Sequence, residues 1–182
     1  SISDVVNVFP EPIAAFATGN VCFGSPSLFV NQSGVPGGET FTSSWSFSGG
    51  LSSNQNDPSV VFQNSGMQQA TLTVTSNSGC TDQTTQLLTV YNSPNAGFNA
   101  TQNCENLPTQ FNDLSTSQDG SIVAWNWSFG DGNSDGNPSP VHTYNAPGTY
   151  NVCLTISDSS TGCYSTYCDS VTVTGSVLCN LA

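Results

Sequence analysis

Short apolar runs along this chain alternate with polar residues at a period of two, and Gly, Pro, Asn, Asp and Ser separate the runs. In the run 150–156, for example, Val152, Leu154 and Ile156 take every second place, which puts them on one face of a strand. Helical periodicity is absent, so the pattern predicts an all-β sandwich. The expected strands lie at 14–19, 25–30, 42–47, 59–62, 68–75 and 84–91, and again at 96–101, 107–112, 122–129, 141–144, 149–157 and 166–174.

The whole pattern occurs twice, with an offset of 82 residues between the two copies. A repeat of this length is a complete small domain, because solenoid and propeller units are only about 20–50 residues long. We therefore predict two tandem domains, at residues 12–93 and 94–175, with 176–182 as a tail or linker. The landmarks Pro12, Phe16, Cys22 and Trp45 recur as Pro94, Phe98, Cys104 and Trp127.

The first residues of the chain resemble the end of such a domain. Residues 4–12 align with residues 86–94, which cover the last predicted strand of the first copy and its linker. Residues 1–11 are therefore predicted to be the last strand of a preceding module plus a linker. Either a longer array is interrupted here, or this strand pairs with the sheet edge of another copy.

Large aromatic residues are expected to fill the two cores. Trp45 and Phe47 share one strand face in the first copy, and Trp125, Trp127 and Phe129 share the corresponding face in the second. Burial of each such side chain stabilises a domain by about 1.5–3 kcal/mol, a large contribution for domains of this size.

The charge of the chain excludes several classes of partner. It has 12 acidic residues, no Lys and no Arg, for a net charge of −12. Nucleic-acid binding is excluded because neutralising phosphates needs Lys and Arg, and attraction to anionic lipid fails for the same reason. No run approaches the roughly 18 apolar residues of a membrane span, so direct membrane insertion is not expected.

The 7 cysteines indicate disulfides rather than a metal site. No CxxC pair occurs, and His142 is the one histidine, so the usual zinc donor set is missing. Disulfides persist in oxidising compartments, which predicts a secreted or cell-surface location. Cys22 and Cys80 hold places that match those of Cys104 and Cys163, so one disulfide within each domain is the simplest pairing.

Cys153 and Cys168 occur only in the second copy, where the first copy has Thr71 and Thr85. Alternation places both cysteines on the outer face of neighbouring strands, and residues that face each other there have the separation that a disulfide needs. We predict a third disulfide between them. Cys179 is left unpaired: either it is free, or it bonds another chain or a neighbouring module.

One turn resembles the start of a calcium loop. Residues 131–136, Asp-Gly-Asn-Ser-Asp-Gly, match D-x-N-x-D-G, but the twelfth position, which needs an acid, is His142. An EF-hand is therefore incomplete. Asp131, Asn133 and Asp135 could still ligate calcium with backbone carbonyls, whereas the alternative is ordinary turn chemistry, in which Asp and Asn cap their own backbone. No other cofactor is expected.

Catalytic patterns are absent from the sequence. His142 would be the only imidazole base, and no spacing of Ser, Cys or Asp around it marks a triad. Asp131 and Asp135 lie in a turn rather than across a cleft, as a pair of glycosidase carboxylates would. The chain is therefore predicted not to be an enzyme, with no catalytic residues.

The second copy resembles the PKD (polycystic kidney disease) domain. The resemblance rests on Trp-Asn-Trp-Ser-Phe-Gly-Asp-Gly at 125–132 and on Val-His-Thr-Tyr at 141–144, followed by Gly-Thr-Tyr-Asn-Val-Cys-Leu at 148–154. The first copy is degenerate: its turn lacks the motif Asp, and Val60 and Gln68 replace the motif His and Tyr. The resemblance implies an immunoglobulin-like sandwich, a generally non-catalytic module, and a structural role for His142.

A modular extracellular function is therefore expected. The favoured interpretation is a structural or adhesive module of a bacterial surface protein, appendage or filament. Its partners would be other copies or modules of the same protein, or a surface polysaccharide or glycan. The alternative is a carbohydrate- or protein-binding accessory module of a secreted hydrolase.

Overall fold

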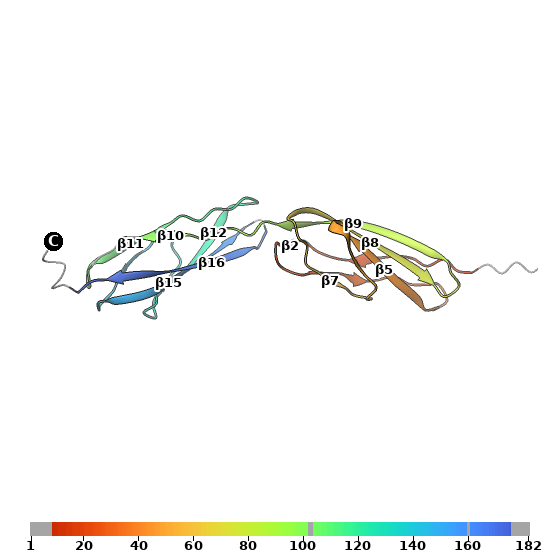
Figure 1. The fold of residues 1–182 in the computed structure, drawn as a ribbon, viewed down its shortest axis with the longest axis horizontal. Helices are drawn as coiled ribbons and strands as arrows, with labels where there is room; N and C mark the ends of the chain where they lie inside the picture. The colour runs from red at the N-terminus through yellow and green to blue at the C-terminus, as the bar shows by residue number, and fades with distance from the viewer. Residues whose placement is uncertain (1–8, 102–103, 160, 176–182) are drawn as a thin grey trace, which may run out of the picture. The chain divides into compact units, whose positions relative to one another are not determined.

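The computed structural model describes residues 9–101, 104–159 and 161–175 (Figure 1). The chain divides into two compact units between Tyr91 and Asn92, here called module one and module two. Both are immunoglobulin-like β-sandwiches, so the predicted fold class is confirmed. The predicted extra strand before residue 9, the tail at 176–182 and Cys179 lie outside the described residues.

Module one is built on a five-stranded sheet of order β2-β9-β8-β5-β6. Its pairs are antiparallel, except that β2 runs parallel to β9. Two short strand pairs, β1–β4 and β3–β7, supply the opposite layer. The core forms between this layer and the five-stranded sheet. The elements are β1 (Phe16–Ala17), β2 (Val21–Cys22), β3 (Ser27–Leu28), β4 (Val30–Asn31), β5 (Phe41–Phe47), the 3-10 turn η1 (Ser48–Gly50), β6 (Leu51–Ser53), β7 (Ser59–Val60), β8 (Gly66–Ser76) and β9 (Thr81–Tyr91).

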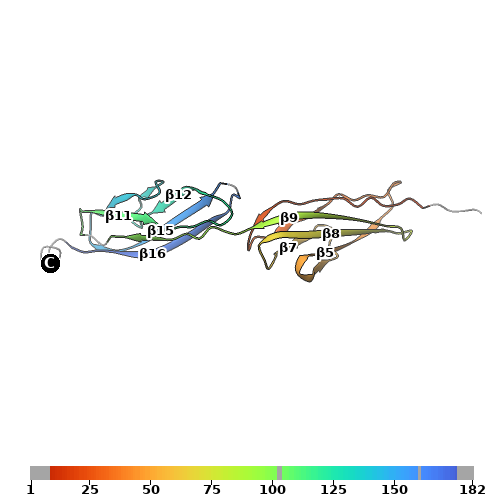
Figure 2. The ribbon, with the colours of Figure 1, turned by 90° about the horizontal axis from the view of Figure 1, so that it is seen from above.

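Module two has the same plan in two sheets, of orders β13-β12-β15-β16 and β10-β11-β14. Its long hairpin β15–β16 corresponds to β8–β9 of module one, and in each hairpin the two strands lie side by side (Figure 2). The strands are β10 (Phe98–Ala100), β11 (Pro108–Asp113), β12 (Ile122–Ser128), β13 (Ser134–Asp135), β14 (Val141–Thr143), β15 (Gly148–Asp158) and β16 (Tyr164–Val173).

Every predicted strand range overlaps a strand of the structure. The strands that the pattern missed are β2, β6 and β13, which have two or three residues each. A strand this short cannot display an alternation, and its pairing is decided by neighbouring strands instead.

A buried tryptophan stands at the centre of each core, as predicted. Trp45 is 1% exposed and Trp127 is 0% exposed. Each indole N–H donates to a loop carbonyl, to Gln55 at 3.0 Å and to Asn137 at 2.9 Å, so neither ring is buried with an unsatisfied donor. Trp125 differs from this pair, because it is only partly buried.

The two long hairpins carry the same cross-strand position with different chemistry. In module two, Cys153 faces Cys168 and forms a disulfide with a Cα–Cα distance of 4.1 Å, which confirms that predicted pair. In module one, Thr71 faces Thr85 in the same register, and their hydroxyl oxygens are 2.9 Å apart. The backbones are therefore equivalent, and only the side-chain link differs.

Replacing Thr71 and Thr85 by cysteine should reproduce the disulfide of module two in module one. A bridge that closes a loop of about 15 residues should raise the free energy of unfolding by about 2–3 kcal/mol. Urea unfolding with and without dithiothreitol, in a Cys80→Ser background, measures the gain. The double serine variant is the matched control, and an oxidised variant no more stable than its reduced form would contradict the expectation.

Candidate functional site

The motif histidine lies in an aromatic corner of module two. Strand β14 presents His142, and its Nε2 is 2.8 Å from Oδ2 of Asp131, in the turn after β12. The imidazole stacks on Phe129 with 4.2 Å between centroids and 4° between planes, and Tyr144 meets it edge-on at 4.6 Å. The ring is therefore held by a hydrogen bond and by two aromatic contacts.

Tyr144 closes the same corner from inside. It is 1% exposed, and its hydroxyl donates to the Phe129 carbonyl oxygen at 3.0 Å. Burial raises the pKa of Tyr144, and the negative charge of Asp131 and the nearby Tyr150 raise it further. The phenol therefore stays protonated and keeps donating this bond.

Gly130 sets the path of the turn. Its φ of 80° lies in the left-handed region, and a Cβ there would stand 2.7 Å from the backbone oxygen of Asn151 on β15. Only glycine fits such a close approach between two backbones. The turn is thereby pressed against β15, and this fixes where the next residue, Asp131, projects.

Asp131 has the one resolved carboxylate pKa shift in this corner. Burial opposes its ionisation, but the hydrogen bonds from His142 and from the backbone and side chain of Asn133 lower its pKa overall. The side chains of Asp131 and His142 are 19% and 13% exposed. Both oxygens of the carboxylate thus accept hydrogen bonds from the turn or from the histidine. The carboxylate therefore stabilises the turn and is not available as a catalytic base.

The predicted calcium ligands do not converge in the structure. Asp135 lies in β13, and one of its oxygens accepts the backbone N–H and side-chain amide of Asn137. Asn133 donates to Asp131 instead. Across residues 9–101, 104–159 and 161–175, no group of three His, Cys, Asp or Glu side chains could hold a metal. Calcium binding at Asp131, Asn133 and Asp135 stays a prediction.

Module one closes the equivalent corner without ionisable groups. Phe47 and Phe62 take the places of Phe129 and Tyr144, and their centroids are 6.3 Å apart. Ser48 replaces the motif glycine, and its hydroxyl accepts the backbone N–H of Gln69 at 2.8 Å. The degenerate motif therefore keeps the aromatic corner and lacks the hydrogen bond between histidine and aspartate.

The predicted disulfide between Cys22 and Cys80 is wrong. Cys22 pairs with Tyr91, the last residue of β9, whereas Cys80 directly precedes Thr81, the first. An extended strand rises about 3.4 Å per residue, so the two ends of β9 are roughly 34 Å apart. Disulfides need a Cα–Cα distance below about 7 Å. Cys80 is a free thiol in the structure, and Cys22 is disulfide-bonded to a different partner.

The same geometry overturns the predicted pair of Cys104 and Cys163. Cys104 forms an isolated β-bridge, a backbone pairing, with Thr174 just after the last residue of β16. Cys163 directly precedes the first residue of β16. A strand of ten residues separates them by roughly 30 Å. Both are disulfide-bonded, but not to each other. The repeat relates Cys22 to Cys104 and Cys80 to Cys163, but it carries no information on which cysteines are close enough to bond.

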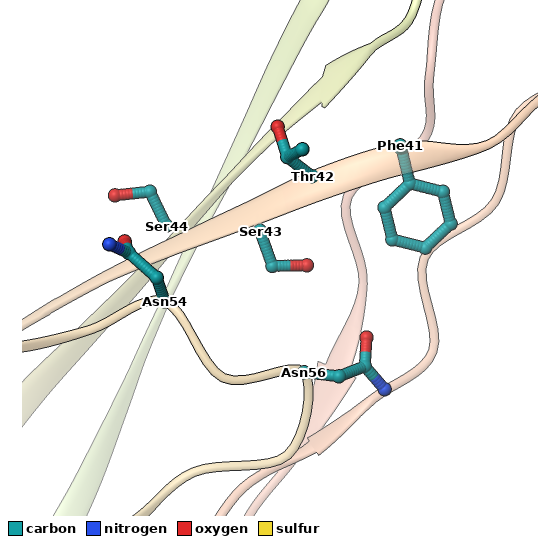
Figure 3. A pocket seen from close by; sticks show the side chains of 6 residues that line it. All are labelled: Phe41, Thr42, Ser43, Ser44, Asn54 and Asn56. Atoms are coloured by element: carbon teal, nitrogen blue, oxygen red, sulfur yellow. The ribbon is translucent and has the colours of Figure 1, made fainter.

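A depression in module one was not predicted. It encloses about 540 Å³ between β5 and the segment after β6, and its lining residues are labelled in Figure 3. Phe41 and Ser43 lie on the side of β5 where Asn56 also lies. Asn31 donates from its amide to Ser43 Oγ at 2.8 Å and to Asn56 Oδ1 at 3.0 Å. The lining residues are Phe41, Thr42, Ser43, Ser44, Asn54 and Asn56, none of them charged.

The repeat explains this depression. The counterpart of Ser43 in module two is Trp125, and the counterpart of Asn31 is Asp113. The Trp125 indole N–H donates to Asp113 Oδ2 at 2.6 Å, where module one has the hydrogen bond between Asn31 and Ser43. An indole is therefore replaced by a hydroxymethyl group in module one. The exchange of Trp for Ser was the signal in the sequence that could have revealed the site.

Comparison with known proteins identifies the repeated unit. The family model described as "PKD domain" matches residues 9–90 and 91–174. The PKD1 domain of the metalloprotease PrtV of Vibrio cholerae is 30% identical, with a TM-score of 0.41, over 45% of this chain and 98% of that one. The PKD1 domain of Epp from Vibrio anguillarum is 28% identical, with a TM-score of 0.42, over 46% and 95%.

The curated relatives of this chain include collagenases. Collagenase ColA of Bacillus cereus is 40% identical over 47 residues, which are 26% of this chain and 5% of the collagenase. Collagenase ColA of Clostridium perfringens is 42% identical over 48 residues, which are 26% and 4%. This chain therefore matches about a twentieth of the length of these relatives. In the described part of the chain, no helix is long and apolar enough to cross a membrane.

Replacing Asp131 by asparagine should destabilise module two at neutral pH and much less in acid. The pKa of Asp131 is lowered in the fold, so its ionised form stabilises module two above the ordinary carboxylate pKa. That contribution disappears as the pH falls through the lower, folded-state pKa. We expect a loss of about 1 kcal/mol at pH 6, as for a typical hydrogen bond.

Urea unfolding at pH 6 and at about pH 3, just below the ordinary carboxylate pKa, measures this difference. Asp135→Asn is the matched control, because it removes the same charge and leaves His142 its partner. An equal loss in both variants, or a loss that does not change with pH, would contradict the role of Asp131.

Proposed function

Since the chain belongs to the PKD domain family and carries two copies of the domain in tandem, we propose that it is a non-catalytic structural and adhesive segment of an extracellular protein. In this proposal the parent protein is a surface appendage or filament. The observation that carries it is the motif corner of module two. The one histidine and its carboxylate partner are engaged in closing a turn between aromatic rings, and no reactive group is left over there.

Sulfur chemistry and charge support the extracellular setting. The disulfide between Cys153 and Cys168 crosses an exposed hairpin face, and such bonds persist where the medium is oxidising. The chain also has no Lys or Arg, so proteases of trypsin specificity find no cleavage site in it. Its net charge of −12 favours solubility of the array.

Immunogold electron microscopy of the producing cells tests this proposal. Antibodies raised against the 182-residue chain should label the exterior of unpermeabilised cells, along extended surface structures. An antibody against a cytoplasmic protein is the control for intact cells. Labelling only after permeabilisation, or recovery of the protein solely as a soluble hydrolase in the medium, would contradict the surface role.

A second candidate function is binding of a neutral glycan by module one. The depression beside β5 offers hydroxyl and amide groups next to the ring of Phe41, and sugars are bound by this combination of neutral hydrogen bonds and an aromatic face. Its lining carries no charge, so a neutral polyol suits it better than an ion. In this role the chain would be a binding accessory of a larger secreted enzyme, as its match to parts of collagenases suggests.

Module two supplies the natural variant for a test. Ser43→Trp introduces the residue that module two has at this place, and its indole should fill the depression. We expect at least a tenfold weaker affinity for neutral oligosaccharides, about 1.4 kcal/mol, measured on a glycan array and then by calorimetry. Leu87→Trp adds the same ring at an exposed place on β9 and is the control. Unchanged binding by the Ser43 variant would rule this site out.

A further inference from the structure

Module one carries a cysteine at each of its two ends. We call the end of a module at which the chain enters it the upstream end. The opposite end, where the chain leaves the module, is the downstream end. Cys22 lies at the downstream end, beside Tyr91 at the end of β9. Cys80 lies at the upstream end, directly before β9, and two residues later the Asp82 carboxylate accepts the backbone N–H of Ala14 at 2.7 Å.

Module two has the same arrangement. Cys104 lies at its downstream end, bridged to Thr174 after β16. Cys163 lies at its upstream end, directly before β16, where Ser165 accepts the backbone N–H of Ala96 at 3.4 Å. The two upstream cysteines are therefore equivalent in the fold as well as in the repeat.

The local turns confirm that Cys80 and Cys163 hold one and the same position. Each follows a glycine with positive φ, 86° at Gly79 and 70° at Gly162. The carbonyl oxygen of each accepts a backbone N–H from the end of the preceding strand, at 2.9 Å in both modules. What differs is their state: Cys163 is disulfide-bonded and fully buried, whereas Cys80 is a free thiol of intermediate exposure.

The bond made by Cys163 shows what this position does. Its partner is not Cys104, which lies at the opposite end of β16, and not Cys153 or Cys168, which bond each other. A cysteine at the upstream position thus forms a disulfide with a residue beyond the described cysteines of its own module. Cys80 has the same turn, and its thiol is free and partly exposed.

We propose that Cys80 is a linking cysteine, which forms a disulfide with the downstream cysteine of another PKD module. Cys22 and Cys104 exemplify that downstream position, and both already have disulfide partners. The module that bonds Cys80 is therefore a further one, either in the same polypeptide or in a second chain. The inference deepens the proposed extracellular function, on which it rests for an oxidising medium.

The link forms by ordinary thiol–disulfide exchange. The Cys80 thiolate attacks the disulfide of an oxidant, a thiol–disulfide oxidoreductase or a small-molecule disulfide, and one thiol of the oxidant leaves. The thiolate of the partner module then attacks the sulfur of Cys80 in this mixed disulfide, and the second thiol of the oxidant leaves. Two thiols have lost two electrons and two protons, and one disulfide of the oxidant has been reduced.

Peptide mapping of the native, full-length protein tests the proposal. The protein is alkylated with N-ethylmaleimide without reduction, denatured, and digested with endoproteinase Asp-N, because trypsin has no site in this chain. We expect mass spectrometry to find the Cys80 peptide joined to a peptide with a downstream cysteine of another module. The linked Cys153–Cys168 pair in the same digest is the internal control.

Electrophoresis with and without reductant distinguishes the two sources of the partner. A partner in the same polypeptide leaves the chain mass unchanged on reduction, whereas a partner in a second chain gives a covalent dimer that reduction separates. Either result supports the link. Quantitative alkylation of Cys80 in the native protein, or its recovery joined only to a small thiol, overturns the link but leaves the extracellular function standing.

The isolated 182-residue chain gives the complementary measurement. With no further module present, Ellman's reagent should count one more thiol in the wild-type chain than in Cys80→Ser. The melting temperatures of the two should agree, because Cys80 has no bond to lose. Equal thiol counts would mean that Cys80 is bonded within this chain, which would overturn the proposal.

Discussion

The buried tryptophan of each module is the constraint on which its structure depends. Trp45 and Trp127 each lie on an interior strand of the larger sheet, contact aromatic rings from the facing layer, and donate from the indole to a loop carbonyl. One side chain thereby joins both layers and a connecting loop. In a domain of about 80 residues with a small core, loss of such a contact would remove several kcal/mol from a modest total.

Around the buried tryptophan, the two modules differ in side-chain chemistry at three places. The motif corner is a hydrogen-bonded histidine and aspartate among aromatic rings in module two and two phenylalanines in module one. The hairpin position is a disulfide in one and a pair of threonines in the other. The place of Trp125 is held by Ser43, and a depression results. The two modules therefore share one core arrangement and differ in chemistry at these three places.

The alternation of apolar residues predicted nearly the whole fold, because it reports directly which side of a strand is buried. It placed every strand long enough to alternate, and it set Cys153 and Cys168 opposite each other. Pairing of Cys22 with Cys80 failed because repeat equivalence carries no information about distance. The depression was missed because it arises where Ser43 stands in place of a large side chain, and hydrophobic periodicity does not report the size of a side chain that is absent.

The pairing of an early strand with the last strand has a mechanical consequence. In module one, β2 runs parallel to β9. In module two, Cys104 and Thr174 form an isolated parallel β-bridge at the equivalent place. Tension applied to the termini of such a module pulls these partners past each other along their length. Their hydrogen bonds then share the load and must break together, whereas a hairpin pulled open from its ends loses them one at a time. Such a module is therefore expected to resist unfolding by tension applied to its termini.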